Sequence, residues 1–329
     1  MFVVGITESG YVPSTTSTVV SATYGYFAGG QPSSGVTNAT DRITFSTGAT
    51  AANTASNMST AVRSPAGITD KTTYGYFAGG STSTGNTETA NTDRIILSTS
   101  VTSANTVSNL SAGRHLLIGI SDGSTYGYWS GGSTGASVAT TDRIVFSTGV
   151  TSANTVSNLP TAVLSSGSVS DGATYGYAVG GITGTTTVIA TAQRITFSTG
   201  IYAANTASNL TAIRCNLTGL SDGTTYGYFC GGATAQTGGI VNLTDKILFS
   251  SGVTTAQTAA NLTSTRARTG AVSDGKTYGY IAGGYTNGTT TVQVTADMLT
   301  FSSQTTAANT TANLTAAKGG MANLSDYAL

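Results

Sequence analysis

The sequence predicts an all-β protein, a six-bladed β-propeller with four antiparallel strands in each blade. Two observations carry this prediction: a motif that recurs six times at intervals of 49 to 52 residues, and short segments with strand periodicity in every copy. One unit of this length cannot bury its own hydrophobic face, so such repeats form solenoids, propellers or arrays. The motif, Tyr-Gly-Tyr-x-x-Gly-Gly, starts at Tyr24, Tyr74, Tyr126, Tyr175, Tyr226 and Tyr278.

Each copy contains four segments that resemble strands. Residues 42–45, 143–146 and 194–197 place aliphatic and aromatic side chains two apart, the period of a pleated strand. Gly, Thr and Ser dominate the remainder, and these residues are poor in helix interiors. The four expected strands are an apolar one such as 116–120, the Tyr-Gly-Tyr strand, the Asp-Arg-Ile strand and an Ala-Asn-Thr strand.

The two ends of the chain are out of phase with the repeat. Residues 314–326 copy the segment that elsewhere precedes Tyr-Gly-Tyr, and only three residues follow them. We therefore expect the C-terminal strand to close the ring beside residues 24–30, which removes the exposed sheet edges. Residues 5–11 also resemble a first strand and offer the alternative closure. The predicted domains are a propeller over 21–329 and an N-terminal attachment arm over 1–20.

A Ser-Asp-Gly sequence precedes the Tyr-Gly-Tyr strand in four copies, with its acid at Asp122, Asp171, Asp222 and Asp274. Asp-Gly is a strong hairpin signal, because Gly accepts the positive φ of tight turns and Asp tolerates it. We interpret these residues as turns. A ring of calcium ligands is the alternative, but it needs further oxygen ligands nearby.

On the basis of these residues, the repeat resembles the kelch repeat. This resemblance implies the propeller fold but implies no particular activity. The strand ending in Gly-Gly matches the kelch pattern, and so does a basic position before each first strand, occupied by Arg114, Arg214, Arg266 and Lys318. Val62 and Val163 depart from it, and the kelch tryptophan is missing. More narrowly, Tyr-Gly-Tyr-Phe-x-Gly-Gly followed by Thr-Asp-Arg-Ile-x-Phe-Ser is similar to repeats in structural proteins of tailed marine and cyanobacterial bacteriophages.

The composition limits the partners. Only 8% of residues are charged, with 13 basic and 13 acidic side chains, so there is no basic field for nucleic acid or an anionic membrane. No apolar run is long enough to span a membrane, and residues 1–5 do not resemble a secretory signal peptide. A polar β surface without an export signal suits a virion protein released by lysis. An intracellular propeller is the alternative.

The sequence indicates no enzyme, metal or cofactor. The single histidine, His115, cannot build a multi-imidazole copper or zinc site, and no nucleophile and carboxylate are marked around it. We interpret it as a blade-surface residue. Arginines recur at Arg42, Arg94, Arg143 and Arg194, three of them beside an aspartate as in Asp142-Arg143. This recurrence indicates salt-bridged packing between blades or a solvated face.

Cys215 and Cys230 lie in one blade, and they face each other if the turn is centred on Asp222-Gly223. Facing residues of an antiparallel pair come close enough for a disulfide. Free buried thiols are the alternative, since cysteine is a common small core residue.

The segments after each Gly-Gly vary in length and sequence, and in a propeller all six emerge on one face. Diverse loops on a rigid scaffold are a common binding surface. Tyr285 is the only aromatic residue among them. The candidate binding residues on this loop face are Asn38, Asn86, Glu88, Thr134, Thr185, Gln236, Tyr285 and Asn287.

We expect a non-enzymatic virion protein, a tail-fibre or receptor-binding propeller whose loop face contacts a host surface glycan or protein. Residues 1–20 would join it to other virion proteins. A capsid or tail decoration with a purely structural role, and a cellular lectin-like propeller, remain alternatives.

Overall fold

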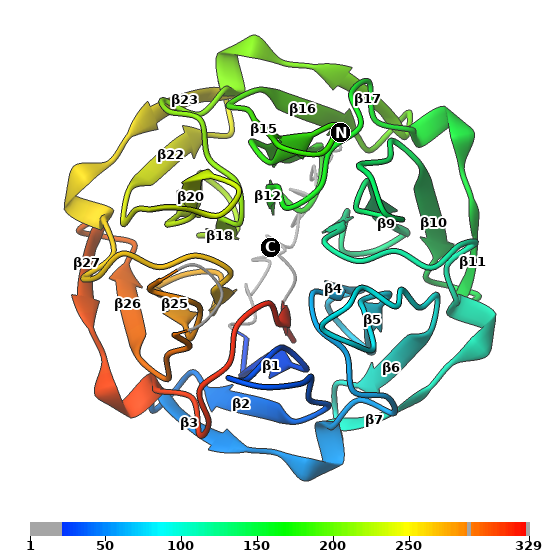
Figure 1. The fold of residues 1–329 in the computed structure, drawn as a ribbon, viewed down its shortest axis with the longest axis horizontal. Coiled ribbons are helices and arrows are strands. Elements are labelled where there is room, and N and C mark those ends of the chain that lie inside the picture. Colours follow the sequence, from blue (N-terminus) through cyan, green and yellow to red (C-terminus); the bar gives the residue numbers. More distant parts are fainter. Residues whose placement is uncertain (1–21, 288–290, 327–329) are drawn as a thin grey trace, which may run out of the picture.

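A computed structural model describes residues 22–287 and 291–326, which form six four-stranded antiparallel sheets around a central axis (Figure 1). The predicted six-bladed β-propeller is confirmed. The innermost strands are β4 (Ala66–Thr69), β8 (Ile118–Ser121), β12 (Gly167–Ser170), β18 (Thr218–Ser221), β24 (Gly270–Ser273) and β28 (Ala322–Ser325). The second strands carry Tyr-Gly-Tyr and are β1 (Tyr24–Ala28), β5 (Tyr74–Ala78), β9 (Tyr126–Ser130), β13 (Tyr175–Val179), β19 (Tyr226–Cys230) and β25 (Tyr278–Ala282).

The outer half of each blade repeats equally closely. The third strands are β2 (Thr40–Thr44), β6 (Thr92–Ile96), β10 (Thr141–Val145), β16 (Ala192–Thr196), β22 (Thr244–Leu248) and β26 (Ala296–Thr300). The outermost strands are β3 (Ala49–Ala52), β7 (Val101–Ala104), β11 (Val150–Ala153), β17 (Ile201–Ala204), β23 (Val253–Ala256) and β27 (Thr305–Ala308). Two loops add short hairpins, β14 (Ile182–Thr183) with β15 (Thr187–Val188), and β20 (Ala233–Ala235) with β21 (Gly238–Ile240).

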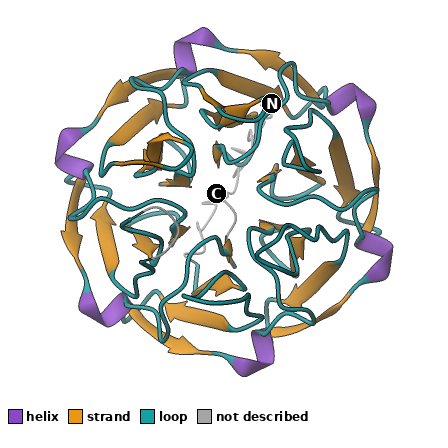
Figure 2. Ribbon diagram, viewed as in Figure 1, coloured by secondary structure: helices purple, strands orange, loops and turns teal. Residues whose placement is uncertain are grey.

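A short 3₁₀ helix follows each outermost strand at the circumference (Figure 2). The prediction placed Ala-Asn-Thr in the fourth strand, but the strand ends at the alanine and the Thr begins the 3₁₀ turn. A second asparagine closes this turn, and its side chain accepts the N–H at the start of the third strand, as Asn158 does from Thr141 at 2.9 Å. The turns are η1 (Thr54–Ser56), η2 (Thr106–Ser108), η3 (Thr155–Ser157), η4 (Thr206–Ser208), η5 (Thr258–Ala260) and η6 (Thr310–Ala312).

The C-terminal strand closes the ring, as predicted. Strand β28 pairs with β1, with Tyr26 opposite Leu324. This blade is built from both ends of the chain, so no continuous turn joins its first two strands. Asp326 takes the place of the turn aspartate, since its carboxylate accepts the N–H groups of Thr23 and Tyr24 at 2.8 and 2.9 Å. The alternative first strand at 5–11 and the predicted arm at 1–20 lie outside the described residues.

The Ser-Asp-Gly turns are confirmed as turns, and their aspartates act as turn caps. In blade 3, Oδ1 of Asp122 accepts the N–H groups of Ser124, Thr125 and Tyr126 at 2.7 to 3.0 Å. The preceding serine links neighbouring blades: the Ser170 hydroxyl donates to the carbonyl of Ser121 at 3.0 Å. Three equivalent hydroxyls, those of Ser121, Ser221 and Ser273, make the same contact to the blade before them.

Close packing between blades explains the Tyr-Gly-Tyr motif. The second tyrosine is buried, and Tyr128 stacks on Phe197 of the next blade with ring centres 6.3 Å apart. The side chain of Ile68 on the preceding blade packs over Gly127, where a Cβ atom would lie 2.2 Å from the Ile68 Cδ1. Any larger residue there would require the Ile68 side chain to move.

The recurring Asp-Arg pair does not form one salt bridge per blade. Asp142 pairs instead with Arg114 at the basic position before the inner strand, at 2.6 Å. Arg143 lies over the ring of Tyr126, 4.5 Å from its centre, a cation–π arrangement. Among the described residues, no helix is long and apolar enough to cross a membrane.

Candidate functional site

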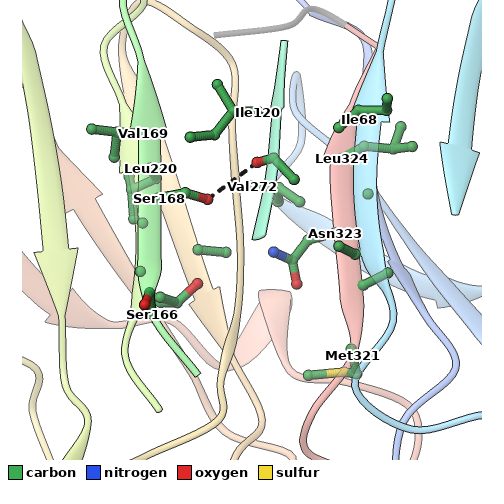
Figure 3. Close-up of a pocket in the computed structure, with 18 of the residues that line it drawn as sticks. Ile68, Ile120, Ser166, Ser168, Val169, Leu220, Val272, Met321, Asn323 and Leu324 are labelled. Carbon is green, nitrogen blue, oxygen red and sulfur yellow. Dashed lines mark hydrogen bonds between the residues drawn. The ribbon is translucent and has the colours of Figure 1, made fainter. Parts of the chain in front are cut away.

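A channel runs along the axis between the six inner strands, with a volume of about 230 Å³ (Figure 3). It stays open because the residues at its midpoint are mostly small, such as Gly67, Gly119 and Gly219. In blade 1 the same level holds Asn323, whose carboxamide points into the cavity (Figure 3). The ring-closing strand therefore contributes the largest polar side chain at the middle of the channel.

Three side-chain oxygen atoms that belong to channel-lining residues are buried and have no hydrogen-bond partner among the described residues. They are the hydroxyls of Ser165 and Thr269 and Oδ1 of Asn323. Buried polar groups are almost always hydrogen-bonded, to water where the protein offers no partner. These atoms indicate that the channel interior binds water or the polar groups of a ligand.

A closed ring of backbone hydrogen bonds surrounds the axis at the end of the channel that faces the Gly-Gly loops. One residue of each blade donates its N–H to the carbonyl of the blade before it, at 2.7 to 3.0 Å. All six have positive φ, although only one is glycine. We call this the axial ring, formed by Ser64, Leu116, Ser165, Asn216, Arg268 and Gly320.

Beyond the axial ring the channel widens into a hollow of about 610 Å³ on the loop face, which we call the funnel. Its wall combines the Gly-Gly loops with the segments that lead into the inner strands. Charged side chains stand at its base, and amides and hydroxyls stand around its rim. The polar and charged residues that line it are Gln31, Arg63, Thr84, Asn86, His115, Ser133, Thr185, Thr186, Gln236 and Arg268.

Arg63 ties the loop of blade 2 to the base of the funnel. Its Nε donates to the carbonyl of Ser83 at 3.0 Å, and its terminal nitrogens donate to the carbonyl of Thr84 and the side chains of Asn86 and Gln31. The arginine is buried and its donors are used within the protein. It holds the loop in one shape.

His115 is not the surface residue that the sequence indicated. It is 3% exposed and lies at the base of the funnel, with Nδ1 3.3 Å from Oε1 of Glu88. Burial lowers the pKa of His115 below its ordinary value, and the nearby charges of Arg63 and Arg268 act in the same direction, while Glu88 opposes them. The imidazole is therefore mainly neutral at pH 7.

Arg268 occupies the boundary between funnel and channel and lines both hollows. Its Nε donates to Oδ1 of Asn216 at 3.2 Å. Its two terminal nitrogens have no hydrogen-bond acceptor among the described residues, in contrast to those of Arg63. Arg268 is therefore the cation at the base of the funnel that is free to contact a ligand.

The structure brings three of the predicted binding residues together. Asn86, Thr185 and Gln236 are exposed and line the funnel, and the Gln236 side chain donates to the carbonyl of Thr185 at 3.0 Å, which links the loops of two blades. Glu88 reaches the base of the funnel through His115.

The other four predicted residues lie elsewhere. Tyr285, the one aromatic candidate, is 0% exposed and its hydroxyl donates to the carbonyl of Gln31, so its ring is not accessible on the loop face. Asn38 donates to the carbonyl of Met58 and supports its own loop. Thr134 and Asn287 are exposed but do not line the funnel.

The two cysteines are free and buried. They do not face each other: Thr218 lies opposite Cys230, and Cys215 lies opposite Ala233. The expected facing pair was wrong because the Asp222 turn is longer than a two-residue hairpin, and this moves its centre towards Thr224. The alternative of free buried thiols agrees with the structure. Burial raises the pKa of both thiols to about 11.

Prediction from the sequence missed Arg63, Arg268 and the burial of His115, all in the segment between the basic position and the inner strand. That segment reads as an apolar run. A comparison of its copies contains the missing signal, because the axial-ring position changes from Ser64 to Leu116, Asn216 and Arg268, and the position before it varies as widely.

In the part of the chain that the structure describes, no group of three or more His, Cys, Asp or Glu side chains is arranged to hold a metal ion. The turn aspartates lie at the opposite end of the strands from the funnel and use one oxygen as a turn cap. No protein family model matches the sequence, and a comparison with curated proteins finds no significant relative.

Proposed function

We propose that the protein is a non-enzymatic virion protein, a tail-fibre or receptor-binding propeller of a tailed bacteriophage, which contacts the host surface through the loops after each Gly-Gly. The observation that carries the binding role is the funnel. Loops that differ from blade to blade meet there around one hollow, on a scaffold that hardly varies.

The loops are held in place before any ligand binds. Arg63 fixes the loop of blade 2, Gln236 bridges two loops, and the N–H of Ser137 donates to the carbonyl of Gly184 across another pair of blades at 3.4 Å. Preorganised loops lose little entropy on binding. The likeness of the repeat to phage structural proteins supports the virion assignment.

Immunoelectron microscopy of particles from the source, with an antibody against this chain, tests the location. We expect label at the tail tip or fibres. Label on no particle would contradict the virion assignment and leave the cellular lectin-like propeller.

Adsorption of particles that carry loop variants tests the binding face. We expect Gln236→Ala and Thr185→Ala to slow adsorption about tenfold when combined, because they remove rim contacts. The matched control is Thr224→Ala, an exposed threonine in a turn at the opposite end of the strands. Equal adsorption of all variants would contradict the role of the funnel.

A decoration protein of capsid or tail is the second candidate, and the outer rim favours it. Exposed aliphatic side chains recur on the outermost strands and 3₁₀ turns of blades 2 to 5. They are Val101, Val107, Val150, Val156, Ile201 and Val253, each 44 to 63% exposed. The matching positions of blade 6 are Thr305 and Thr311. If the rim packs against another subunit, Val107→Thr with Val156→Thr releases the protein from particles, whereas loop variants do not.

A further inference from the structure

The charged residues of the described chain fall into separate zones. Five aspartates are buried between strands, and six others cap turns at the far end of the channel. Glu88 is the one acidic side chain on the loop face in the described residues, and it is paired with His115. The buried acids are Asp41, Asp93, Asp142, Asp245 and Asp297, and the turn acids are Asp70, Asp122, Asp171, Asp222, Asp274 and Asp326.

The funnel therefore has more positive than negative charge. Arg63 and Arg268 are both near its base, and their charges interact: each arginine is close enough to lower the pKa of His115, and Arg63 also lowers that of Arg268. Burial is the largest cause of the lowered pKa of Arg268. An arginine stays protonated in spite of such shifts, so both guanidinium groups remain positively charged and attract an anion.

Arg268 is placed to receive that anion. Its backbone has φ of 55° in the axial ring, where the equivalent residue of blade 1 is Gly320. A long side chain in this conformation is uncommon. The terminal nitrogens form a planar fork that suits a carboxylate or sulfate, and they have no acceptor within the described residues.

We propose that Arg268 is the anion-recognition residue of the funnel, and that the ligand is a saccharide bearing a carboxylate or sulfate group. This inference rests on the proposed function and names the chemical class of its ligand. The anionic group lies against the Arg268 fork at the axial ring, and the sugar hydroxyls face the rim.

The rim favours a saccharide over an apolar ligand. Asn86, Thr185 and Gln236 present amides and hydroxyls to the hollow, while Leu116 and Leu164 are the largest apolar side chains in its wall. Neutral donors and acceptors around one cation match a polyhydroxylated ligand with a single acidic group.

The test measures binding of three trisaccharides to the full chain by calorimetry: galacturonic acid, sulfated galactose and neutral galactose. We expect at least one charged trisaccharide to bind at least tenfold more tightly than the neutral one. Arg268→Asn should weaken that binding at least tenfold, about 1.4 kcal/mol. Asparagine is the residue that blade 5 has at this position, Asn216, so the variant is compatible with the backbone.

Arg194→Gln is the matched control, because this arginine lies over the Tyr175 ring, far from the funnel. It should change affinity less than twofold. The inference is overturned if Arg268→Asn binds like the wild type, or if the wild type shows no preference for charge. Whether galacturonate or sulfated galactose binds more tightly identifies the acidic group.

The same variants separate this inference from the proposed function. If Gln236→Ala with Thr185→Ala slows adsorption but Arg268→Asn does not, the loop face binds the host without anion recognition. If neither slows adsorption and the purified chain still prefers a charged trisaccharide, the host-binding function fails and the anion site stands.

Discussion

Blades 2 and 3 differ at the buried basic position before the inner strand, which is Val62 in blade 2 and Arg114 in blade 3. In blade 3, the Arg114 guanidinium lies 2.6 Å from Asp142 and also donates to the carbonyls of Gly131 and Thr140, at 2.9 and 2.6 Å. In blade 2 the basic position holds Val62, yet the matching Asp93 is still present and 3% exposed. One of its oxygens accepts the N–H of Ser59, and the other has no partner among the described residues.

Blade 4 shows the third arrangement of the same position. Val163 replaces the arginine and Gln193 replaces the aspartate, so the pair is neutral. The Gln193 amide accepts the N–H of Thr161 and donates to its carbonyl, at 2.8 and 3.1 Å. The three blades show that the fold needs a hydrogen-bonding side chain here, and that a charge pair is one of three ways to supply it.

Among substitutions at this position, Arg114→Met should lower the stability of the protein the most. It leaves the Asp142 carboxylate buried without its cation and removes the bonds to two carbonyls. Removal of one partner of a buried ion pair costs about 3 to 5 kcal/mol. We expect that loss in the free energy of unfolding, measured by denaturant titration at pH 7. Arg143→Gln, which removes only a cation–π contact, is the control and should lose less than about 1 kcal/mol.

The double variant Arg114→Val with Asp142→Gln copies blade 4 into blade 3. We expect it to recover most of the loss, to within about 2 kcal/mol of the wild type, because no charge is left unpaired. A double variant as unstable as Arg114→Met would show that the ion pair itself, not the avoidance of a lone charge, stabilises blade 3.

The sequence was sufficient for the fold because each blade repeats the same short-range signals. Tyr-Gly-Tyr, Ser-Asp-Gly and the C-terminal half-repeat predicted the second strands, the turns and the ring closure. The register of the strand pairs was harder to predict from the sequence. It depends on the length of the turn, which is set by how many backbone N–H groups the Asp222 side chain caps. The error of three positions in pairing Cys215 with Cys230 has this cause.

The funnel could be predicted only in part. The loops were identifiable by their variation, which found Asn86, Thr185 and Gln236. Arg63 and Arg268 lie more than 200 residues apart and meet only because the ring closes. Tyr285 was misplaced because composition does not distinguish an exposed aromatic from one that is covered by a neighbouring blade.

Val62→Arg should sharpen the comparison by converting blade 2 to the arrangement of blade 3. The new guanidinium would contact the Asp93 carboxylate, as Arg114 contacts Oδ2 of Asp142. We expect a gain of about 1 to 2 kcal/mol at pH 7, from charge-assisted hydrogen bonds less the desolvation of the arginine. Val163→Arg is the matched control, because Gln193 offers no negative charge and the buried cation should destabilise blade 4. A loss of stability in both variants would show that blade 2 has no room for the arginine.

Asp93→Asn should have the smallest effect and a distinctive pH dependence. Burial raises the pKa of Asp93 above its ordinary value, although hydrogen bonds from Ser59 oppose the shift. A raised folded-state pKa means that the folded protein holds the proton more tightly than the unfolded chain. Asp93 therefore favours folding below the unfolded pKa of about 3.9, and this contribution is lost as the pH rises through the folded pKa.

The substituted asparagine does not titrate, so the stability of the Asp93→Asn variant should rise relative to that of the wild type between pH 4 and pH 7, by about 1 kcal/mol or less. Denaturant titrations across this range measure the difference. A difference that stays constant with pH would mean that Asp93 ionises in blade 2 as readily as in the unfolded chain, so that water or a neighbouring donor compensates for the cation that Val62 lacks.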